Sequence, residues 1–426
     1  MEFENEFLNV DFHSVPLEPP FQLDQSWYKK TVKRLQGKLS EKGLDGMLLA
    51  DQWNIRYFTG LDCWVTERPF WVFIPSNGKP SMYYPSLDRD LVKTWWIPDG
   101  SWYFDYPHCG SFDVNVYDVG DRVDLFTWLL RNISDLGYEK AKIGIDKEFS
   151  SSQKQSAEEK YPAMSFIPAS DLCLKMRQIK TPEEIDLLTN AVRFQDHLLE
   201  YARYLIIHYP GVTDFSIQHE VKRYGTHLLM KYHQLDGGLH HGTGIDLAFT
   251  VRAGLPSAYP HPNQFYYHHI KEGDAIQLAG FVHVGGYVGE GYRAVQVNPA
   301  SDLQKRMWEV HTEMVFTQIE NTRPGVRCCD VAEKVLAVAK KNGMDKYLYH
   351  RVGHGIGMEG HQAPYITPGD PTVIEEGMVF SNEPGLYNPE GGFGYNHSNA
   401  LLVTDTGVRV LNETPITKEW CFVDFE

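Results

Sequence analysis

The sequence predicts an α/β protein with two domains behind an extended arm. Helical patterns alternate with short apolar runs over residues 20–170, and a helix-capping sequence at Thr181 begins a second series of helices separated by glycine-rich strands. The chain has 426 residues, enough for two or three domains. We therefore expect an N-terminal arm at 1–25, a first domain at 26–172 and a second domain at 173–426.

The first domain should alternate helices with short strands. Residues 27–42 place apolar side chains on one helical stripe, and Gly43 is suited to end that helix. The other elements that we expect are strands at 44–49, 70–74, 81–84 and 141–145, and a helix at 122–136.

The second domain should open with a long helix. Thr181 and Glu184 form a capping-box pattern, and Pro182 suits the first helical turn, so this helix should run to about residue 209. Further helices are expected at 213–231, 302–320 and 328–342, with glycine-rich strands between and after them.

Composition excludes several classes of partner. The chain carries 40 basic and 56 acidic side chains, a net charge of −16, so we expect no nucleic-acid partner. No run approaches the roughly 20 apolar residues of a membrane span, and the N-terminus lacks the regions of a secretory signal. Six scattered cysteines without a CxxC pair, together with the lack of a signal, indicate a reduced, cytoplasmic protein. No polybasic patch suggests a membrane surface, so we expect no membrane partner.

Four polar residues of the second domain stand in unusual surroundings. Glycines flank His354 closely and leave room for a ligand beside its ring, and Glu383 closes an apolar strand before Pro-Gly. His261 ends a loop rich in small residues; by itself it could be an ordinary loop histidine. Glu290 ends a glycine-rich strand, and a structural ion pair with Arg293 is disfavoured because i and i+3 face opposite sides of a strand.

Several motifs in order resemble the creatinase/aminopeptidase P family over roughly residues 25–420. They are HRVGHGIGMEGH at 350–361, GMVFSNEPG at 377–385, GYVGEGYR at 286–293, MRQIKTPEEI at 176–185 and NIRYFTG at 54–60. The resemblance implies a creatinase-like N-terminal domain followed by a C-terminal pita-bread catalytic domain.

Metallopeptidases of that family use two Asp, one His and two Glu as metal ligands. Carried onto this chain, these positions are Ala279, Glu290, His354, Glu383 and Ser398. Ala279 and Ser398 cannot supply a carboxylate, so the resemblance implies no dinuclear site. One divalent ion on Glu290, His354 and Glu383 stays a minority possibility, and we expect no cofactor.

Metal-free members of the fold, such as creatinase and ectoine hydrolase, offer the main functional expectation. It is a metal-independent hydrolase that cleaves a C–N bond of a small polar or zwitterionic substrate. The resemblance implies that His261 is the general acid/base and that Glu290 is a nucleophile or an orienting carboxylate. His354, Glu383 and His361 would orient the substrate beside Ala279 and Ser398, and Arg68 would reach into the site of a partner subunit in a homodimer.

Other functions remain open at this stage. They are a metal-dependent Xaa-Pro dipeptidase or aminopeptidase, a lyase of the dimethylsulfoniopropionate type, and a non-catalytic binding module. Geometry adds one expectation: strands at 275–282 and 287–295, joined by a turn centred on 284–285, would place Ala279 directly opposite Glu290.

Overall fold

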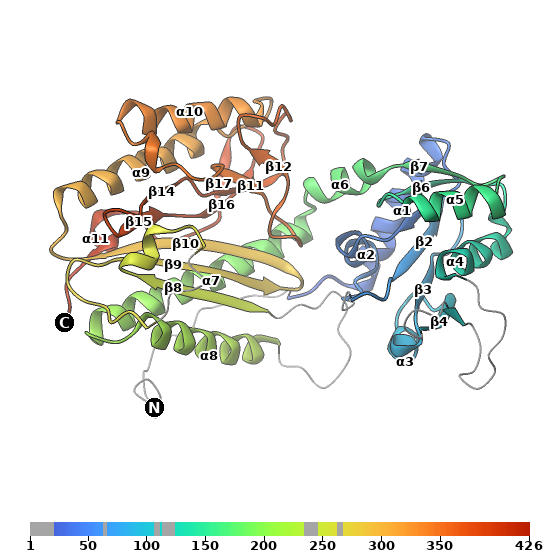
Figure 1. Ribbon diagram of the computed structural model, residues 1–426, viewed down its shortest axis with the longest axis horizontal. Helices are drawn as coiled ribbons and strands as arrows, with labels where there is room; N and C mark the ends of the chain where they lie inside the picture. The colour runs from blue at the N-terminus through green and yellow to red at the C-terminus, as the bar shows by residue number, and fades with distance from the viewer. Residues whose placement is uncertain (1–20, 63–65, 106–110, 113–123, 234–245, 262–266) are drawn as a thin grey trace. The chain divides into compact units, whose positions relative to one another are not determined.

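The computed structural model describes residues 21–62, 66–105, 111–112, 124–233, 246–261 and 267–426. The chain forms two compact units. We call them the N-terminal unit, built mainly from Leu23–Arg177, and the C-terminal unit, which contains the chain from Gln178 onward. Both mix helices with sheets, which confirms the predicted α/β class (Figure 1).

The N-terminal unit is a mixed sheet covered by helices. Its strand order is β5-β4-β3-β2-β1-β6-β7. The strands are β1 (Gly46–Leu49), β2 (Trp71–Pro75), β3 (Ser81–Pro85), β4 (Gly100–Asp105), β5 (Ser111–Phe112), β6 (Lys142–Ile145) and β7 (Ser165–Pro168). The helices are α1 (Gln25–Glu41), α2 (Gln52–Thr59), α3 (Arg89–Val92), α4 (Leu125–Ile133), α5 (Ser151–Lys160) and α6 (Ser170–Gln178).

Helix α2 occupies the NIRYFTG segment, for which the sequence pattern predicted no helix. The Asp51 side chain accepts hydrogen bonds from the backbone of Trp53 and Asn54, and Gly60 ends the helix with a positive φ of 72°. Eight residues are too few to show a clear helical period, so only these caps could have revealed it.

The C-terminal unit contains two larger sheets and a two-stranded ribbon. The first sheet has the order β18-β10-β9-β8, the second β12-β11-β13-β16-β17, and the ribbon pairs β14 with β15. The strands are β8 (Leu247–Ala253), β9 (Ala275–Val284), β10 (Tyr287–Val297), β11 (Gly353–Gly355), β12 (Gln362–Ile366), β13 (Val379–Asn382), β14 (Gly385–Asn388), β15 (Phe393–Asn396), β16 (Asn399–Val403), β17 (Val408–Val410) and β18 (Phe422–Val423). The helices are α7 (Pro182–His208), α8 (Asp214–His233), α9 (Asp302–Asn321), α10 (Cys328–Lys341) and α11 (Lys418–Cys421).

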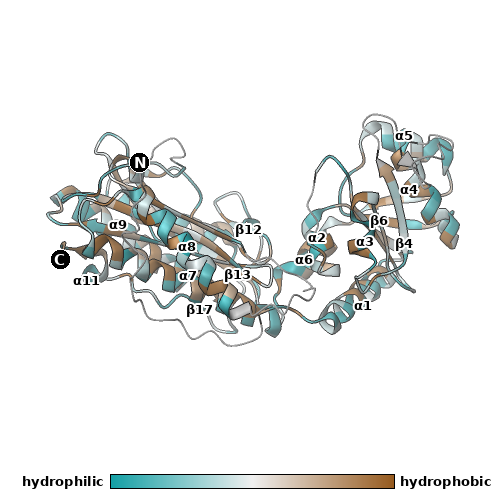
Figure 2. Ribbon diagram, turned by 90° about the horizontal axis from the view of Figure 1, so that it is seen from below, coloured by the Kyte–Doolittle hydropathy of each residue, from teal (hydrophilic) through white to brown (hydrophobic). Residues whose placement is uncertain are grey.

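Helices α7 and α8 lie side by side beneath β8, β9 and β10 (Figure 1). Hydrophilic and hydrophobic residues alternate along both helices, as they do on amphipathic helices packed on a sheet (Figure 2). Gly289 permits the close approach of α7, because a Cβ at this position would lie 2.1 Å from the backbone carbon of Ala191. One face of the sheet is therefore occupied by helices.

The register of the β9–β10 hairpin differs from the expectation. Gly285 and Gly286 form a two-residue turn with φ values of 57° and 83°, so Val284 pairs with Tyr287. Ala279 consequently lies opposite Tyr292, and Glu290 lies opposite Phe281. The predicted pairing of Ala279 with Glu290 is wrong, although both side chains still belong to the same face of the sheet.

In the part of the chain that the structure describes, no helix is long and apolar enough to cross a membrane.

Candidate active site

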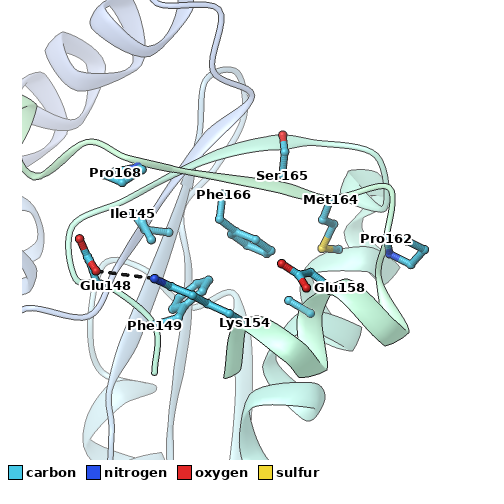
Figure 3. Close-up of a pocket in the computed structure, with 11 residues that line it drawn as sticks. Ile145, Glu148, Phe149, Lys154, Glu158, Pro162, Met164, Ser165, Phe166 and Pro168 are labelled. Atoms are coloured by element: carbon cyan, nitrogen blue, oxygen red, sulfur yellow. Dashed lines mark ion pairs between the residues drawn. The ribbon is translucent and has the colours of Figure 1, made fainter. Parts of the chain in front are cut away.

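A cavity in the N-terminal unit has few polar side chains that could take part in a reaction. It has a volume of about 550 Å³ between α5 and β7 and is lined by apolar side chains such as Phe149, Met164 and Phe166 (Figure 3). Its charged groups include Lys154 and Glu148, which pair with each other at 3.7 Å. None of the residues predicted to act in catalysis lines this cavity.

A cavity of about 850 Å³ in the C-terminal unit is lined by several side chains that can donate or accept protons. His261, His361 and Glu383, three of the residues singled out from the sequence, line it. It also contains polar residues that the sequence analysis did not identify, namely Arg252, Tyr292, His350, Arg351, Tyr387 and Asn396. His350, Arg351 and Tyr292 lie within the quoted motifs but were not assigned a role, whereas Arg252, Tyr387 and Asn396 lie outside those motifs.

Glu290, from the middle of β10, lies fully buried next to this cavity. Its Oε1 accepts a hydrogen bond of 3.0 Å from the hydroxyl of Ser398, whereas Oε2 has no hydrogen-bond partner. Backbone hydrogen bonds between Tyr292 and Ser398 hold the two segments together, and Arg293 donates to the carbonyls of Ser398 and Thr414. Arg293 thus stabilises the backbone and does not pair with Glu290.

His354, on the short strand β11, is also fully buried. Its Nδ1 lies 3.2 Å from the carbonyl of Gly355, which can only accept, so Nδ1 carries the proton. Its Nε2 lies 3.7 Å from Oε2 of Glu290 and 3.0 Å from Oε1 of Glu383. Burial favours the neutral form of His354, but the charge of Glu290 and the bond to Glu383 prevail and raise its pKa.

The carboxyl groups of Glu290 and Glu383 lie close to each other, and both would be negative if both were ionised. Burial raises the pKa of Glu290 to about 8; His354 and the Ser398 hydrogen bond oppose this rise, and the charge of Glu383 adds to it. Burial also favours the neutral form of Glu383, but the bond to His354 prevails and lowers its pKa. Without a cation, one carboxyl group of this pair holds a proton near neutral pH.

His361 stacks on His354, with ring centroids 3.9 Å apart, and remains more exposed. Burial, and then the charge of His354, lower its pKa to about 4. Nη2 of Arg351 lies 3.2 Å from Nδ1 of His361, and a guanidinium can only donate. Nδ1 of His361 therefore accepts, which leaves an N–H donor on Nε2.

The other predicted residues occupy different places. His261 is exposed at the cavity wall, and Ala279 is buried on β9. Arg68 belongs to the N-terminal unit, where it pairs with Glu67. A homodimer in which Arg68 reaches a partner's site stays a prediction.

Three possible ligand atoms lie close enough together to hold a divalent cation. Glu290, His354 and His361 each offer one ligand atom, all within 4.8 Å of one another. Oε2 of Glu290 is buried and lacks a hydrogen-bond partner among the described residues, which is costly unless another group satisfies it. Two imidazoles with one carboxylate form a known zinc donor set.

Comparison with known proteins places this chain among peptidases. The model of metallopeptidase family M24 matches residues 186–405, and that of the creatinase/prolidase N-terminal domain matches residues 32–179. The Xaa-Pro dipeptidase of Lactobacillus helveticus is 27% identical, over 90% of this chain and 96% of its own length. The Xaa-Pro dipeptidase of Pyrococcus furiosus is 23% identical, over 91% and 98%.

Solved structures have the same fold. The dipeptidase PepE from Mycobacterium ulcerans has a TM-score of 0.76 at 21% identity and covers 95% of this chain and 100% of its own. The X-Pro aminopeptidase from Thermotoga maritima has a TM-score of 0.72 at 21% identity, covering 91% and 98%. These likenesses confirm the predicted creatinase-like and pita-bread domains.

Two expectations require correction. The matches support a hydrolase, but they contradict metal-independent cleavage of the creatinase type and favour the Xaa-Pro dipeptidase alternative. The expectation of no cofactor is wrong for the same reason. Ala279 and Ser398 do not exclude a metal site, because Glu290, His354 and Glu383 still bring buried ligand atoms close together without carboxylates at those positions.

Proposed function

Because this chain belongs to metallopeptidase family M24, we propose that it is a metal-dependent dipeptidase of the Xaa-Pro type. The observation that carries the proposal is the buried cluster in which Nε2 of His354 lies 3.7 Å from the unpartnered Oε2 of Glu290 and 3.0 Å from Oε1 of Glu383. The relatives named Xaa-Pro dipeptidase support the choice of substrate.

Glu290, His354 and Glu383 would hold the ion. The Gly355 carbonyl keeps the proton of His354 on Nδ1, so its Nε2 can bind metal. His361 is less suited to be a ligand, because its Nδ1 accepts from Arg351. When bound, a divalent ion supplies Lewis acidity at the scissile carbonyl.

The remaining residues perform the proton chemistry in this proposal. The Nε2–H of His361 can donate a hydrogen bond to the substrate carbonyl oxygen as negative charge develops there. Glu383, whose low pKa keeps it ionised, can accept a proton from the attacking water. His261 at the cavity wall can protonate the departing proline nitrogen, a step that a tertiary amide needs because its nitrogen is a poor leaving group.

Metal analysis combined with dipeptide hydrolysis tests this function. We expect about one equivalent of a divalent transition metal per chain, since the described donors suffice for one ion. Hydrolysis of Ala-Pro should disappear after chelation and return when metal is added. Glu290→Gln should lose both metal and activity, whereas the partly exposed control Glu309→Gln, which gives up only its pairs with Arg306 and Lys418, should keep both. Full activity in metal-free protein would refute the proposal.

A further inference from the structure

The cavity between α5 and β7 of the N-terminal unit exists because α5 fills little of the space beneath it. A helix that covers a sheet usually turns a stripe of large apolar side chains toward that sheet. Helix α5 buries only Ala157, which has the smallest apolar side chain. The core residues Ile145 and Met164 therefore border a space of about 550 Å³ and not a side chain of the helix. Small-molecule sites in proteins have volumes of about 300–1,000 Å³.

Two half-buried aromatic rings form part of the cavity wall. Phe149 packs edge-on against Phe126 of the core, with ring centroids 4.7 Å apart, and against Phe166 of β7 at 4.9 Å. These contacts hold both rings in place beside Met164 (Figure 3). A fixed aromatic wall favours a flat apolar group, and the negative face of an aromatic ring also attracts a cation.

The charged side chains of the wall are one lysine and two glutamates. Lys154 and Glu148 form an ion pair with each other at 3.7 Å. Among the described residues, Glu158 forms neither an ion pair nor a hydrogen bond. Its carboxylate points from α5 toward the ring of Phe166 (Figure 3). The wall of this cavity therefore carries one negative charge without a counter-ion.

This charge distribution favours one class of ligand. A neutral apolar molecule would remove water from Glu158 without replacing its hydrogen bonds, which costs free energy. An anion would be repelled by Glu158 unless it broke the pair of Lys154 with Glu148, and the carboxylate of a zwitterion would meet the same obstacle. A monocation with an apolar body can pair with Glu158 and contact the aromatic rings while the existing ion pair stays intact.

We propose that this cavity binds a small organic monocation, an ammonium group on a flat apolar body, with Glu158 as its counter-ion. The ammonium group lies at the exposed carboxylate of Glu158, and the apolar body lies against Phe149, Phe166 and Met164. The inference goes beyond the proposed peptidase function, because no residue assigned to catalysis or metal binding lines this cavity. Binding here should therefore not depend on the metal.

Four probes that share a phenyl ring and a two-carbon chain test the role of charge. Phenethylamine is the cation, phenethyl alcohol is its neutral analogue, hydrocinnamate is an anion and L-phenylalanine is a zwitterion. In calorimetric titrations of the full chain, the amine should bind about 10-fold more tightly than the alcohol. This is the size expected of a cation–π contact combined with an exposed ion pair. The anion should bind most weakly, and chelation of metal should leave the affinity for the amine unchanged.

Two variants show whether binding occurs in this cavity. Glu158→Gln should lower the affinity for the amine to that for the alcohol, whereas the control Glu159→Gln, on the same helix but outside the cavity wall, should bind as wild type. Ala157→Leu should fill part of the space and abolish binding of both probes; if this variant fails to fold, Glu158→Gln decides by itself.

Several results would overturn the proposal while leaving the peptidase function untouched. They are equal affinities for amine and alcohol, tighter binding of the zwitterion than of the amine, no binding of any probe, and an unchanged affinity for the amine in Glu158→Gln. Loss of amine binding on chelation would place the bound amine in the catalytic cavity and would overturn the proposal as well.

Discussion

Ser398 donates its hydroxyl to Oε1 of Glu290 over 3.0 Å, and so holds one oxygen of a carboxylate whose other oxygen faces His354. This bond favours the ionised form of Glu290 against the effect of burial. In the proposed metal site, a serine at this position would contribute to metal binding without being a ligand itself. It helps a neighbouring carboxyl group to lose its proton.

The first prediction concerns this hydrogen bond. Ser398→Ala should raise the pKa of Glu290 further, so protons compete more strongly with metal for the carboxylate. We expect the metal affinity at pH 7 to fall about 10-fold, the size of a hydrogen bond to a charged group. The pH of half-maximal metal binding should move upward in a titration monitored by calorimetry. Ser398→Thr keeps a hydroxyl and should remain close to wild type; an unchanged affinity in the alanine variant would argue against the role of the bond.

The second prediction concerns the number of metal ions. Ala279 and Ser398 stand where related metallopeptidases are expected to carry carboxylates, and both lie near Glu290 on the same side of the sheet. Ala279→Asp combined with Ser398→Glu adds two carboxylates, which can offset the charge of a second dication. Metal content should rise from about one to about two equivalents per chain. A folded double variant that still holds one ion would show that other features limit the site.

The third prediction concerns acid stability. His311 and His397 are buried with ring centroids 4.7 Å apart, and burial lowers the pKa of His311 to about 3 and that of His397 well below its usual value. Between pH 6.5 and about 3 the unfolded chain binds protons on these rings and the folded chain does not, so stability falls as pH decreases. Each ring contributes a loss of up to about 1.4 kcal/mol per pH unit in this window.

Urea denaturation at pH 7.5 and at pH 5.5 measures this loss. His311→Gln removes one of the two titrating rings and should therefore make the free energy of unfolding less dependent on pH. The exposed control His269→Gln should leave the dependence as it is in wild type. Equal slopes for wild type and His311→Gln would contradict the assignment.

The fourth prediction concerns Gly353, which precedes His354 on β11. A Cβ at this position would lie 2.3 Å from the carbonyl oxygen of Ser381, a backbone atom that cannot move aside without displacing β13. Gly353→Ala should cost several kcal/mol of stability and weaken metal binding, because His354 and Glu383 would separate. Thermal unfolding and metal titration measure both effects. Gly369→Ala, where the added Cβ meets nothing within 4 Å, is the matched control.

Local patterns in the sequence were sufficient to predict the fold and most long helices. The capping box at Thr181 and Glu184 is present, and α7 runs from Pro182 to His208, within one residue of the expected end. Such elements are predictable because their signals lie within a few residues of one another. Glu290, His354 and Glu383 were also selected from the sequence, since glycines and strand ends surround them in recognisable motifs.

The tertiary structure decided what depends on distances between remote segments. The Gly285–Gly286 turn moved the hairpin register by two residues, which set Tyr292 and not Glu290 opposite Ala279. Whether Glu290 and His354 offer a metal site depends on their burial and on the 3.7 Å between Oε2 of Glu290 and Nε2 of His354. Electrostatic energy depends on distance and on exposure to solvent. A linear sequence contains neither quantity.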